Sequence, residues 1–235
     1  MYQLSKHKII IFLFSFLYFA IACSPIAKYK SDPQVINWEK DIREFEKRDS
    51  VETYSPNAIL FTGSSSIRLW SSISTDMAPY EVIHRGYGGA KLSDYAFYAK
   101  RIIYPHKFKA MVLFVANDIA GSEQDKTPEQ VARLCQYIVT TVHNKYPSVP
   151  VFWIEITPTP SRWKVWPKIN EANNRIKELS KKIPNFYVIE TTASYLDANG
   201  LPRKELFRED HLHLNQEGYK LWTDIITKAL NQNLK

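Results

Sequence analysis

The chain has 235 residues, of which 45% are hydrophobic, 14% aromatic and 23% charged. This composition is typical of a folded globular protein and excludes a disordered or fibrous chain, and the length suits one domain with a single core. The formal net charge of +7 comes without dense clusters of Lys and Arg, so nucleic acid is not expected as a partner.

The N-terminus has the pattern of an export signal. Lys6 and Lys8 precede an unbroken apolar run, IIIFLFSFLYFAIA, which is short for a membrane-spanning helix and suits a signal-peptide core. We predict a signal peptide over residues 1–22. The segment from Ala20 to Cys23 resembles the lipobox of bacterial lipoproteins, which implies lipidation of Cys23. The protein is therefore expected to be exported to the cell envelope with a lipid anchor; cleavage without lipidation and a retained single-span anchor are the alternatives.

Removal of residues 1–22 would take away two lysines and no acid, which lowers the formal net charge to +5. With Cys23 lipidated, Cys135 would have no partner, so a disulfide framework is excluded and Cys135 is expected in the core. Residues 23–31 are expected to form a polar tether, and residues 32–235 a single domain.

Strands and helices are expected to alternate along this domain. Asp32-Pro33 suits a helix start, with Val35, Trp38, Ile42 and Phe45 following on one face. Five short apolar segments lack a strict alternation of apolar and polar residues. This pattern is typical of strands that are buried on both faces of a parallel sheet. These predicted strands are Ala58–Thr62, Glu81–His84, Ala110–Val115, Pro150–Thr157 and Phe186–Glu190.

Helix signals lie between and after these strands. Thr127-Pro128-Glu129-Gln130 reads as a capping box, Pro167 opens another helix, and a last helix follows Asn215. The inward-facing residues predicted for the three helices are Val131, Leu134, Cys135, Ile138 and Val142; Ile169, Ala172, Ile176, Leu179 and Ile183; and Trp222, Ile225, Ile226 and Leu230. The fold class predicted is α/β, a three-layer αβα sandwich around a five-stranded parallel sheet.

Reactive residue types follow the predicted strands. They are Gly63-Ser64-Ser65-Ser66, the glycine-rich turn His84–Gly89, Asn117-Asp118, and the segment Glu209–His213 before the last helix. In a parallel sheet such loops share one rim. A serine, donors for an oxyanion, and a histidine with a nearby carboxylate are the groups that acyl transfer needs.

Four segments of the chain resemble the sequence blocks of SGNH hydrolases, the GDSL esterase family. They are "FTGSSSIRLW", "HRGYGGAKLSD", "VAND" and "DHLH", and they occur in the family's order. The resemblance covers the chain from about Asn57 to the C-terminus and implies the flavodoxin-like sandwich of that family.

The resemblance also implies roles for individual residues. Ser65 would be the nucleophile, with Asp210 and His213 completing the triad. The oxyanion hole would be formed by the N–H groups of Ser65 and Gly89 and by the side-chain amide of Asn117. The implied activity is that of a serine esterase on small O-acyl esters, such as acetyl groups on glycans, with no metal and no cofactor.

Two positions depart from the family pattern. Ser64 stands where the family has aspartate, and this is expected to affect the rigidity of the turn more than the chemistry. Val115 stands where the third block has glycine, and its branched side chain is expected to narrow the pocket or shift the oxyanion hole. Ser66 is expected at the helix start, where its hydroxyl would cap backbone N–H groups.

The triad also follows from elementary chemistry. A serine hydroxyl is a weak nucleophile until a base takes its proton, and imidazole suits that task near neutral pH. The base needs a carboxylate on its other ring nitrogen to hold the correct tautomer. Asp210 and His213 are three residues apart in one loop and are expected to supply both groups.

Other functions remain open at this point. The same fold would suit an acyltransferase, or an inactive binding lipoprotein that holds an anion at Gly63–Ser66. His211 and His213 form an HxH pattern but lack an obvious third ligand for zinc. Trp163 and Trp166 suit either packing or a stacking platform for a sugar or acyl chain.

Overall fold

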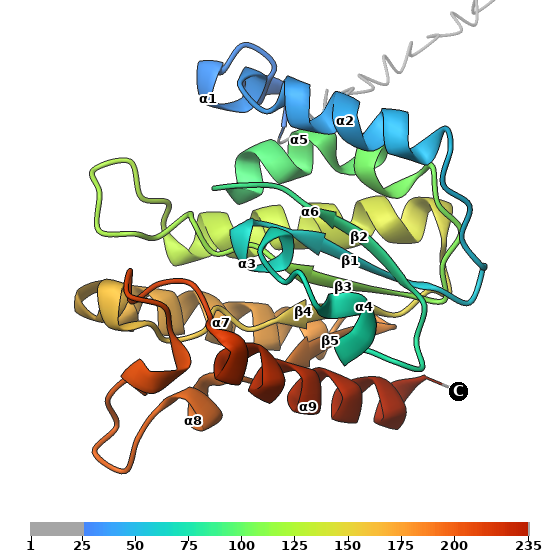
Figure 1. Ribbon diagram of the computed structural model, residues 1–235. Helices are drawn as coiled ribbons and strands as arrows, with labels where there is room; N and C mark the ends of the chain where they lie inside the picture. Colours follow the sequence, from blue (N-terminus) through green and yellow to red (C-terminus); the bar gives the residue numbers. More distant parts are fainter. Residues whose placement is uncertain (1–25, 235) are drawn as a thin grey trace, which may run out of the picture.

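A computed structural model describes residues 26–234 of the protein. The predicted signal peptide and the lipidation site Cys23 lie outside these residues. Five strands form one parallel sheet in the order β2-β1-β3-β4-β5, which confirms the predicted fold class (Figure 1). The strands are β1 (Ile59–Gly63), β2 (Val82–Gly86), β3 (Ala110–Phe114), β4 (Val151–Ile154) and β5 (Phe186–Ile189).

All five predicted strands are found, with ends shifted by a few residues. The largest difference is at β4, where the expected strand Pro150–Thr157 pairs only over Val151–Ile154. The Glu155 N–H makes the last bond to β5, to Ile189 O at 3.0 Å, and the buried Glu155 carboxylate accepts hydrogen bonds from the N–H groups of Thr191 and Thr192. Strands β1, β3 and β4 are completely buried, as expected for strands covered on both faces.

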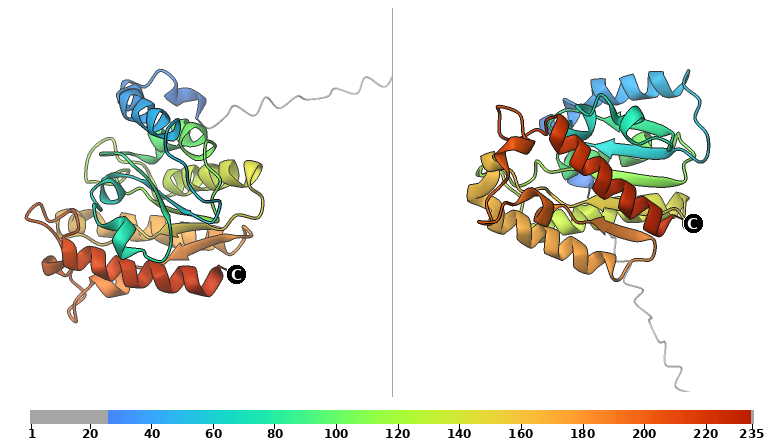
Figure 2. Two further views of the ribbon diagram at one scale, coloured as in Figure 1. Left: turned by 45° about the vertical axis from the view of Figure 1, so that its right-hand side comes forward. Right: turned by 60° about the horizontal axis from the view of Figure 1, so that its bottom comes forward.

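Helices cover both faces of the sheet. Contacts link α2 to α5, α5 to α6 and α6 to α7, and Figure 1 shows these four helices in a row from top to bottom. The last helix, α9, crosses the other face (Figure 2, right). The α-helices are α1 (Pro33–Ile36), α2 (Glu39–Asp49), α3 (Ser65–Arg68), α4 (Ile73–Asp76), α5 (Leu92–Ile103), α6 (Pro128–Lys145), α7 (Trp166–Ser180), α8 (Thr192–Tyr195) and α9 (Gln216–Asn233), and a six-residue 3₁₀ helix spans Pro160–Val165.

The N-terminal segment differs from its prediction in two ways. The expected single helix from Asp32-Pro33 is divided into α1 and α2, because the Trp38 N–H bonds to Val35 O in a tight i to i+3 turn. The expected tether is partly structured, since residues 27–29 form a 3₁₀ turn and Ile26 and Tyr29 pack against the core.

Capping and burial confirm most of the helix predictions. Thr127 and Gln130 form the predicted capping box of α6, and Cys135 is fully buried within that helix. Ile225 is only partly buried, against its prediction, but it packs against the core, as do the partly buried Leu179 of α7 and Ile183, three residues beyond the end of α7. In the part of the chain that the structure describes, we find no helix with the length and apolarity needed to cross a membrane.

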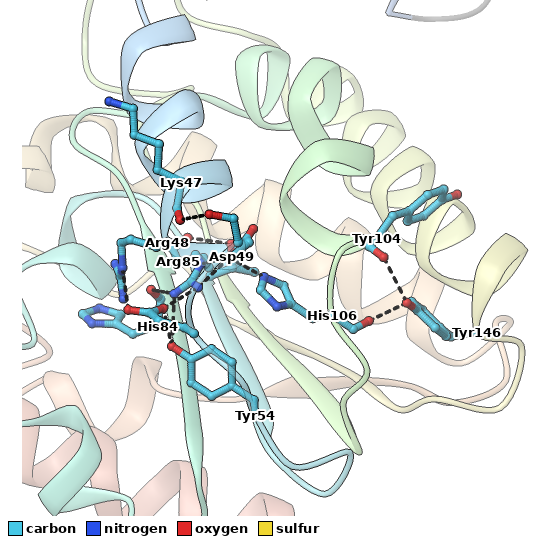
Figure 3. A network of polar contacts seen from close by, with 12 residues as sticks. Lys47, Arg48, Asp49, Tyr54, His84, Arg85, Tyr104, His106 and Tyr146 are labelled. Carbon is cyan, nitrogen blue, oxygen red and sulfur yellow. Dashed lines mark hydrogen bonds and ion pairs between the residues drawn. The ribbon is translucent and has the colours of Figure 1, made fainter.

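A buried polar network ties α2 to the sheet (Figure 3). Arg85 on β2 is fully buried and donates from Nε and Nη2 to Asp49 Oδ1, at 2.9 and 2.5 Å. Its Nη2 also reaches Glu52 at 2.8 Å, and His106 Nε2 lies 3.4 Å from Asp49. Burial lowers the pKa of His106, which favours its neutral form. The network satisfies one buried cation with two carboxylates and thereby fixes the C-terminal end of α2.

Candidate active site

The turn after β1 places Ser65 at the rim of the sheet. Gly63 has φ of +132°, and a Cβ on it would lie 2.0 Å from Phe114 O, so only glycine fits between β1 and β3. The next amide, Ser64 N–H, donates to Phe114 O at 2.8 Å. Helix α3 then begins at Ser65 itself.

This turn lacks the family's aspartate and is held instead by hydrogen bonds to its main chain. Ser64 is buried and is the N-cap residue of α3, yet its side chain makes no capping hydrogen bond. The carbonyl of Ser66 accepts from Tyr219 Oη of α9 at 2.9 Å, and Ile67 O lies 2.6 Å from His84 Nε2. Ser66 lies inside α3, so its predicted role as a capping residue is wrong.

The loop before α9 carries Asp210 and His213. Asp210 Oδ1 accepts the main-chain N–H groups of Leu212 and His213, both at 2.9 Å. These bonds form an Asx turn, and His211 within it has φ of +56°. Arg208 N–H donates to His213 O at 2.8 Å and closes the loop. One short loop therefore fixes the carboxylate and the imidazole relative to each other.

Tertiary packing brings this loop onto Ser65. His213 Nδ1 lies 2.6 Å from Asp210 Oδ2, and His213 Nε2 lies 2.9 Å from Ser65 Oγ, although 148 residues separate the latter two in sequence. Both distances are hydrogen bonds, and they are the two contacts that a Ser-His-Asp triad requires. The side chain of His213 is 22% exposed and that of Asp210 is 48% exposed.

The Asp210 carboxyl is held ionised by its partners. Partial burial raises its pKa, but hydrogen bonds from the His213 side chain and from the N–H groups of His213 and Leu212 outweigh burial and lower the pKa to about 2. An ionised carboxylate accepts the Nδ1–H of His213, which leaves the Nε2 lone pair directed at the Ser65 hydroxyl. The arrangement is poised to remove the serine proton.

The three predicted oxyanion donors come from neighbouring strands. Ser65 follows β1, Gly89 follows β2 and Asn117 follows β3, and β1 lies between the other two strands. Within residues 26–234, neither the N–H of Ser65 nor that of Gly89 donates a hydrogen bond, so both are available. Asn117 Nδ2 gives one of its two hydrogens to Ala90 O at 3.0 Å. The second hydrogen is left for an oxyanion.

The departure at Val115 has a different consequence from the expected one. Its side chain is fully buried within the hydrophobic core, so it does not project from the rim into a pocket. Asp118, beside Asn117, has structural contacts: it is buried, accepts the Leu92 N–H at 2.8 Å and lies 3.2 Å from Lys126 Nζ.

Arg162 was given no role by the sequence, yet it contacts Asn117, the predicted side-chain donor to the oxyanion. Its Nη2 donates to Asn117 Oδ1 at 2.6 Å, and its Nη1 donates to Ala116 O at 2.5 Å. The available signal was its position: it lies in the 3₁₀ helix Pro160–Val165, a few residues beyond β4, where parallel sheets place functional groups.

The remaining rim residues make no part of this arrangement. The rings of Trp163 and Trp166 stack on each other, with centroids 5.9 Å apart and planes at 16°. Each indole thus offers one face to the other, which accords with packing. Among residues 26–234, no three His, Cys, Asp or Glu side chains converge as metal ligands.

Comparison with known proteins agrees with this geometry. The family model for the GDSL-like Lipase/Acylhydrolase family matches residues 61–221, which include Ser65, Gly89, Asn117, Asp210 and His213. The chain belongs to this family. A search of curated protein sequences finds no match.

Solved structures share the fold of this acylhydrolase family member at low sequence identity. A protein from Streptococcus pneumonia has a TM-score of 0.70 and 20% identity, over 86% of this chain and 97% of that one. A GDSL-like lipase from Bacteroides thetaiotaomicron has a TM-score of 0.69 and 15% identity, over 82% and 98%. A carbohydrate esterase family 3 protein from Talaromyces cellulolyticus has a TM-score of 0.60 and 14% identity, over 76% and 98%.

Proposed function

We propose that the protein is a serine esterase that hydrolyses small O-acyl esters through an acyl-enzyme on Ser65. The observation that carries this proposal is the chain of hydrogen bonds from Asp210 through His213 to Ser65 Oγ at the carboxyl edge of the sheet. Membership of an acylhydrolase family supports the class of reaction.

The first half of the reaction forms the acyl-enzyme. Ser65 Oγ attacks the ester carbonyl carbon while its proton passes to His213 Nε2, and Asp210 stabilises the imidazolium. The carbonyl oxygen becomes an oxyanion, which the N–H groups of Ser65 and Gly89 and the Nδ2–H of Asn117 stabilise. The tetrahedral intermediate collapses, and the leaving alkoxide takes the proton from His213.

The second half releases the acid. Water gives a proton to His213 Nε2 and attacks the acyl carbon, and the same donors meet the second oxyanion. The proton then returns to Ser65 Oγ as the bond to the acyl group breaks. These steps use the chain's own side chains, the ester and one water molecule. The products are one alcohol and one carboxylic acid.

Acetyl groups on glycans are the substrate class that we propose. Support comes from the structural similarity to a carbohydrate esterase family 3 protein and to an acetyl esterase. Hydrolysis of p-nitrophenyl esters from acetate to decanoate tests the acyl preference, and release of acetate from an acetylated xylan or peptidoglycan tests the alcohol part. Preference for decanoate over acetate would contradict the small-acyl proposal.

Ser65→Ala tests the nucleophile. We expect this variant to lose hydrolysis and labelling by a fluorophosphonate probe, because among residues 26–234 no other hydroxyl bonds to His213. Ser71→Ala removes an exposed serine six residues away and serves as the matched control. Equal hydrolysis by Ser65→Ala and wild type would refute the proposed function, and an absence of labelling in active wild type would exclude a reactive serine.

We further propose that the protein is an exported lipoprotein anchored through Cys23. The lipobox resemblance supports this proposal, and Ile26 and Tyr29 already pack on the domain. A lipid on Cys23 would therefore hold the domain close to a membrane surface, because two residues separate Cys23 from Ile26. Membrane fractionation and labelling with a palmitate analogue test the anchor, and Cys23→Ser is expected to lose both signals.

A further inference from the structure

Arg162 is the feature that the proposed triad leaves unexplained. The buried Arg85 donates to two carboxylates, and the surface arginines 43, 48, 101, 133, 175 and 203 each pair with a glutamate. Like Arg68 and Arg208, Arg162 has no carboxylate within ion-pair distance among residues 26–234, but it alone of these three bonds to a predicted oxyanion donor. Its two hydrogen bonds go to uncharged oxygens, Ala116 O and Asn117 Oδ1.

These contacts determine which way the Asn117 amide faces. A guanidinium only donates, so the atom that contacts Arg162 Nη2 must be the amide oxygen. The Ala90 carbonyl only accepts, so it must receive the amide nitrogen, at 3.0 Å. A flipped amide would turn NH₂ toward a cation and its oxygen toward a carbonyl. Arg162 therefore keeps the Nδ2 hydrogens on the side of Ala90 O, away from the guanidinium.

Arg162 also changes the strength of the Asn117 donor. A cation that bonds to an amide oxygen draws electron density from the amide nitrogen and makes its N–H more positive. An oxyanion that forms beside Nδ2 would meet both the amide and, behind it, a permanent positive charge. Lys in place of Arg162 would supply the positive charge, and Gln would supply an N–H donor. Neither would donate to both Ala116 O and Asn117 Oδ1 as the guanidinium does.

The loop that carries Arg162 also contacts the triad loop. Ser161 N–H donates to His211 O at 3.1 Å, and His211 lies between Asp210 and His213 in sequence. Two adjacent residues thus bond to two parts of the proposed site: Ser161 bonds to the loop that carries the base, and Arg162 bonds to the predicted oxyanion donor. This position favours a role in positioning over a role in surface solubility.

We propose that Arg162 is a positioning residue that orients and polarises Asn117 for oxyanion stabilisation. This inference rests on the proposed function. It predicts that Arg162 acts on kcat through Asn117, with little effect on KM, because the oxyanion exists only after attack on the ester.

A double-mutant cycle on p-nitrophenyl acetate tests this assignment. We expect Arg162→Ala to lower kcat about 10- to 100-fold and Asn117→Ala about 10²- to 10³-fold. The double variant is expected within about threefold of Asn117→Ala, because the arginine has nothing left to position. Guanidinium ion at millimolar concentration is expected to restore part of kcat in Arg162→Ala and none in the double variant.

Lys164→Ala is the matched control, since it removes an exposed cation from the same loop and is expected to keep wild-type kcat. The inference would be overturned if Arg162→Ala lowered kcat by the same factor in the Asn117→Ala background as in the wild type. It would also be overturned if Arg162→Ala kept the wild-type kcat. If Arg162→Ala fails to fold in a thermal melt, Arg162→Gln takes its place in the cycle. Failure of the proposed function would be recognised separately, because Ser65→Ala would then hydrolyse the ester as fast as the wild type.

Discussion

Asp210→Asn separates the two roles of the triad carboxylate. In the wild type, Oδ1 accepts two main-chain N–H groups at 2.9 Å and Oδ2 accepts from His213 Nδ1 at 2.6 Å. An asparagine has one oxygen for these two tasks. The substitution therefore forces a choice between the Asx turn and the histidine.

The geometry decides that choice in favour of the main chain. Turning the amide oxygen toward His213 would point NH₂ at two N–H donors and lose both bonds, at a cost of about 1 to 3 kcal/mol. A preference of about 2 kcal/mol keeps the oxygen on the main chain in roughly 97% of molecules. The amide NH₂ then faces His213 Nδ1, which must accept, and Nε2 carries the proton.

A protonated Nε2 cannot take the proton of Ser65, so catalysis fails although the fold is unchanged. We expect kcat at pH 7 to fall about 10⁴-fold with a small change in KM. The loss comes from the tautomer more than from charge, because Asp210 is 48% exposed and its field is screened by water. Steady-state hydrolysis of p-nitrophenyl acetate, with far-UV circular dichroism as the folding check, measures the effect.

The chain offers a close control for this substitution. Asp197 also accepts two main-chain N–H groups through Oδ1, from Asn199 at 2.8 Å and Leu201 at 2.9 Å, but it bonds to no histidine. Asp197→Asn makes the same chemical change in the same kind of turn and is expected to keep kcat. A loss of less than tenfold in Asp210→Asn, or an equal loss in Asp197→Asn, would refute the reasoning.

Three further predictions follow from the described contacts. Because its pKa is lowered to about 2, Asp210 stays ionised above about pH 4, and its stabilisation disappears only as the pH falls through 2. Asp210→Asn should therefore remove no ionisation from the pH profile of kcat/KM between about pH 4 and 8, and the loss of one there would contradict this. Arg85→Ala leaves Asp49 buried without its cation and should lower the free energy of unfolding in urea by about 3 to 5 kcal/mol, whereas exposed Arg43→Ala should cost under about 1 kcal/mol. Gly63→Ala should prevent correct folding, because its Cβ would lie 2.0 Å from Phe114 O. Gly200 has open space around it and φ of +74°, so Gly200→Ala should lower the unfolding free energy by only about 1 to 2 kcal/mol. Equal melting temperatures for the two variants would contradict the close approach of β1 and β3.

Local sequence was enough to predict the class of fold. Periodicity, capping residues and apolar runs depend on neighbours within one or two turns, so the five strands, the capping box at Thr127 and the buried Cys135 could be read directly. The family blocks pointed to Ser65 and His213 for the same reason. Element ends were less certain, as the division of α1 from α2 shows, because one i to i+3 bond at Trp38 decides it.

The tertiary structure decided what lies in contact with what. Val115 faces the core rather than the rim. The main chain of the Ser64 turn is held by Phe114 O of β3 and by the Tyr219 hydroxyl of α9. No local pattern encodes these positions. The bond from Arg162 to Asn117 joins two loops 45 residues apart. Sequence by itself determined the elements and the reactive residue types, because these depend on short-range periodicity and chemistry. The neighbours that orient those residues depend on how distant loops meet at one edge of the sheet, and only the folded chain specifies that.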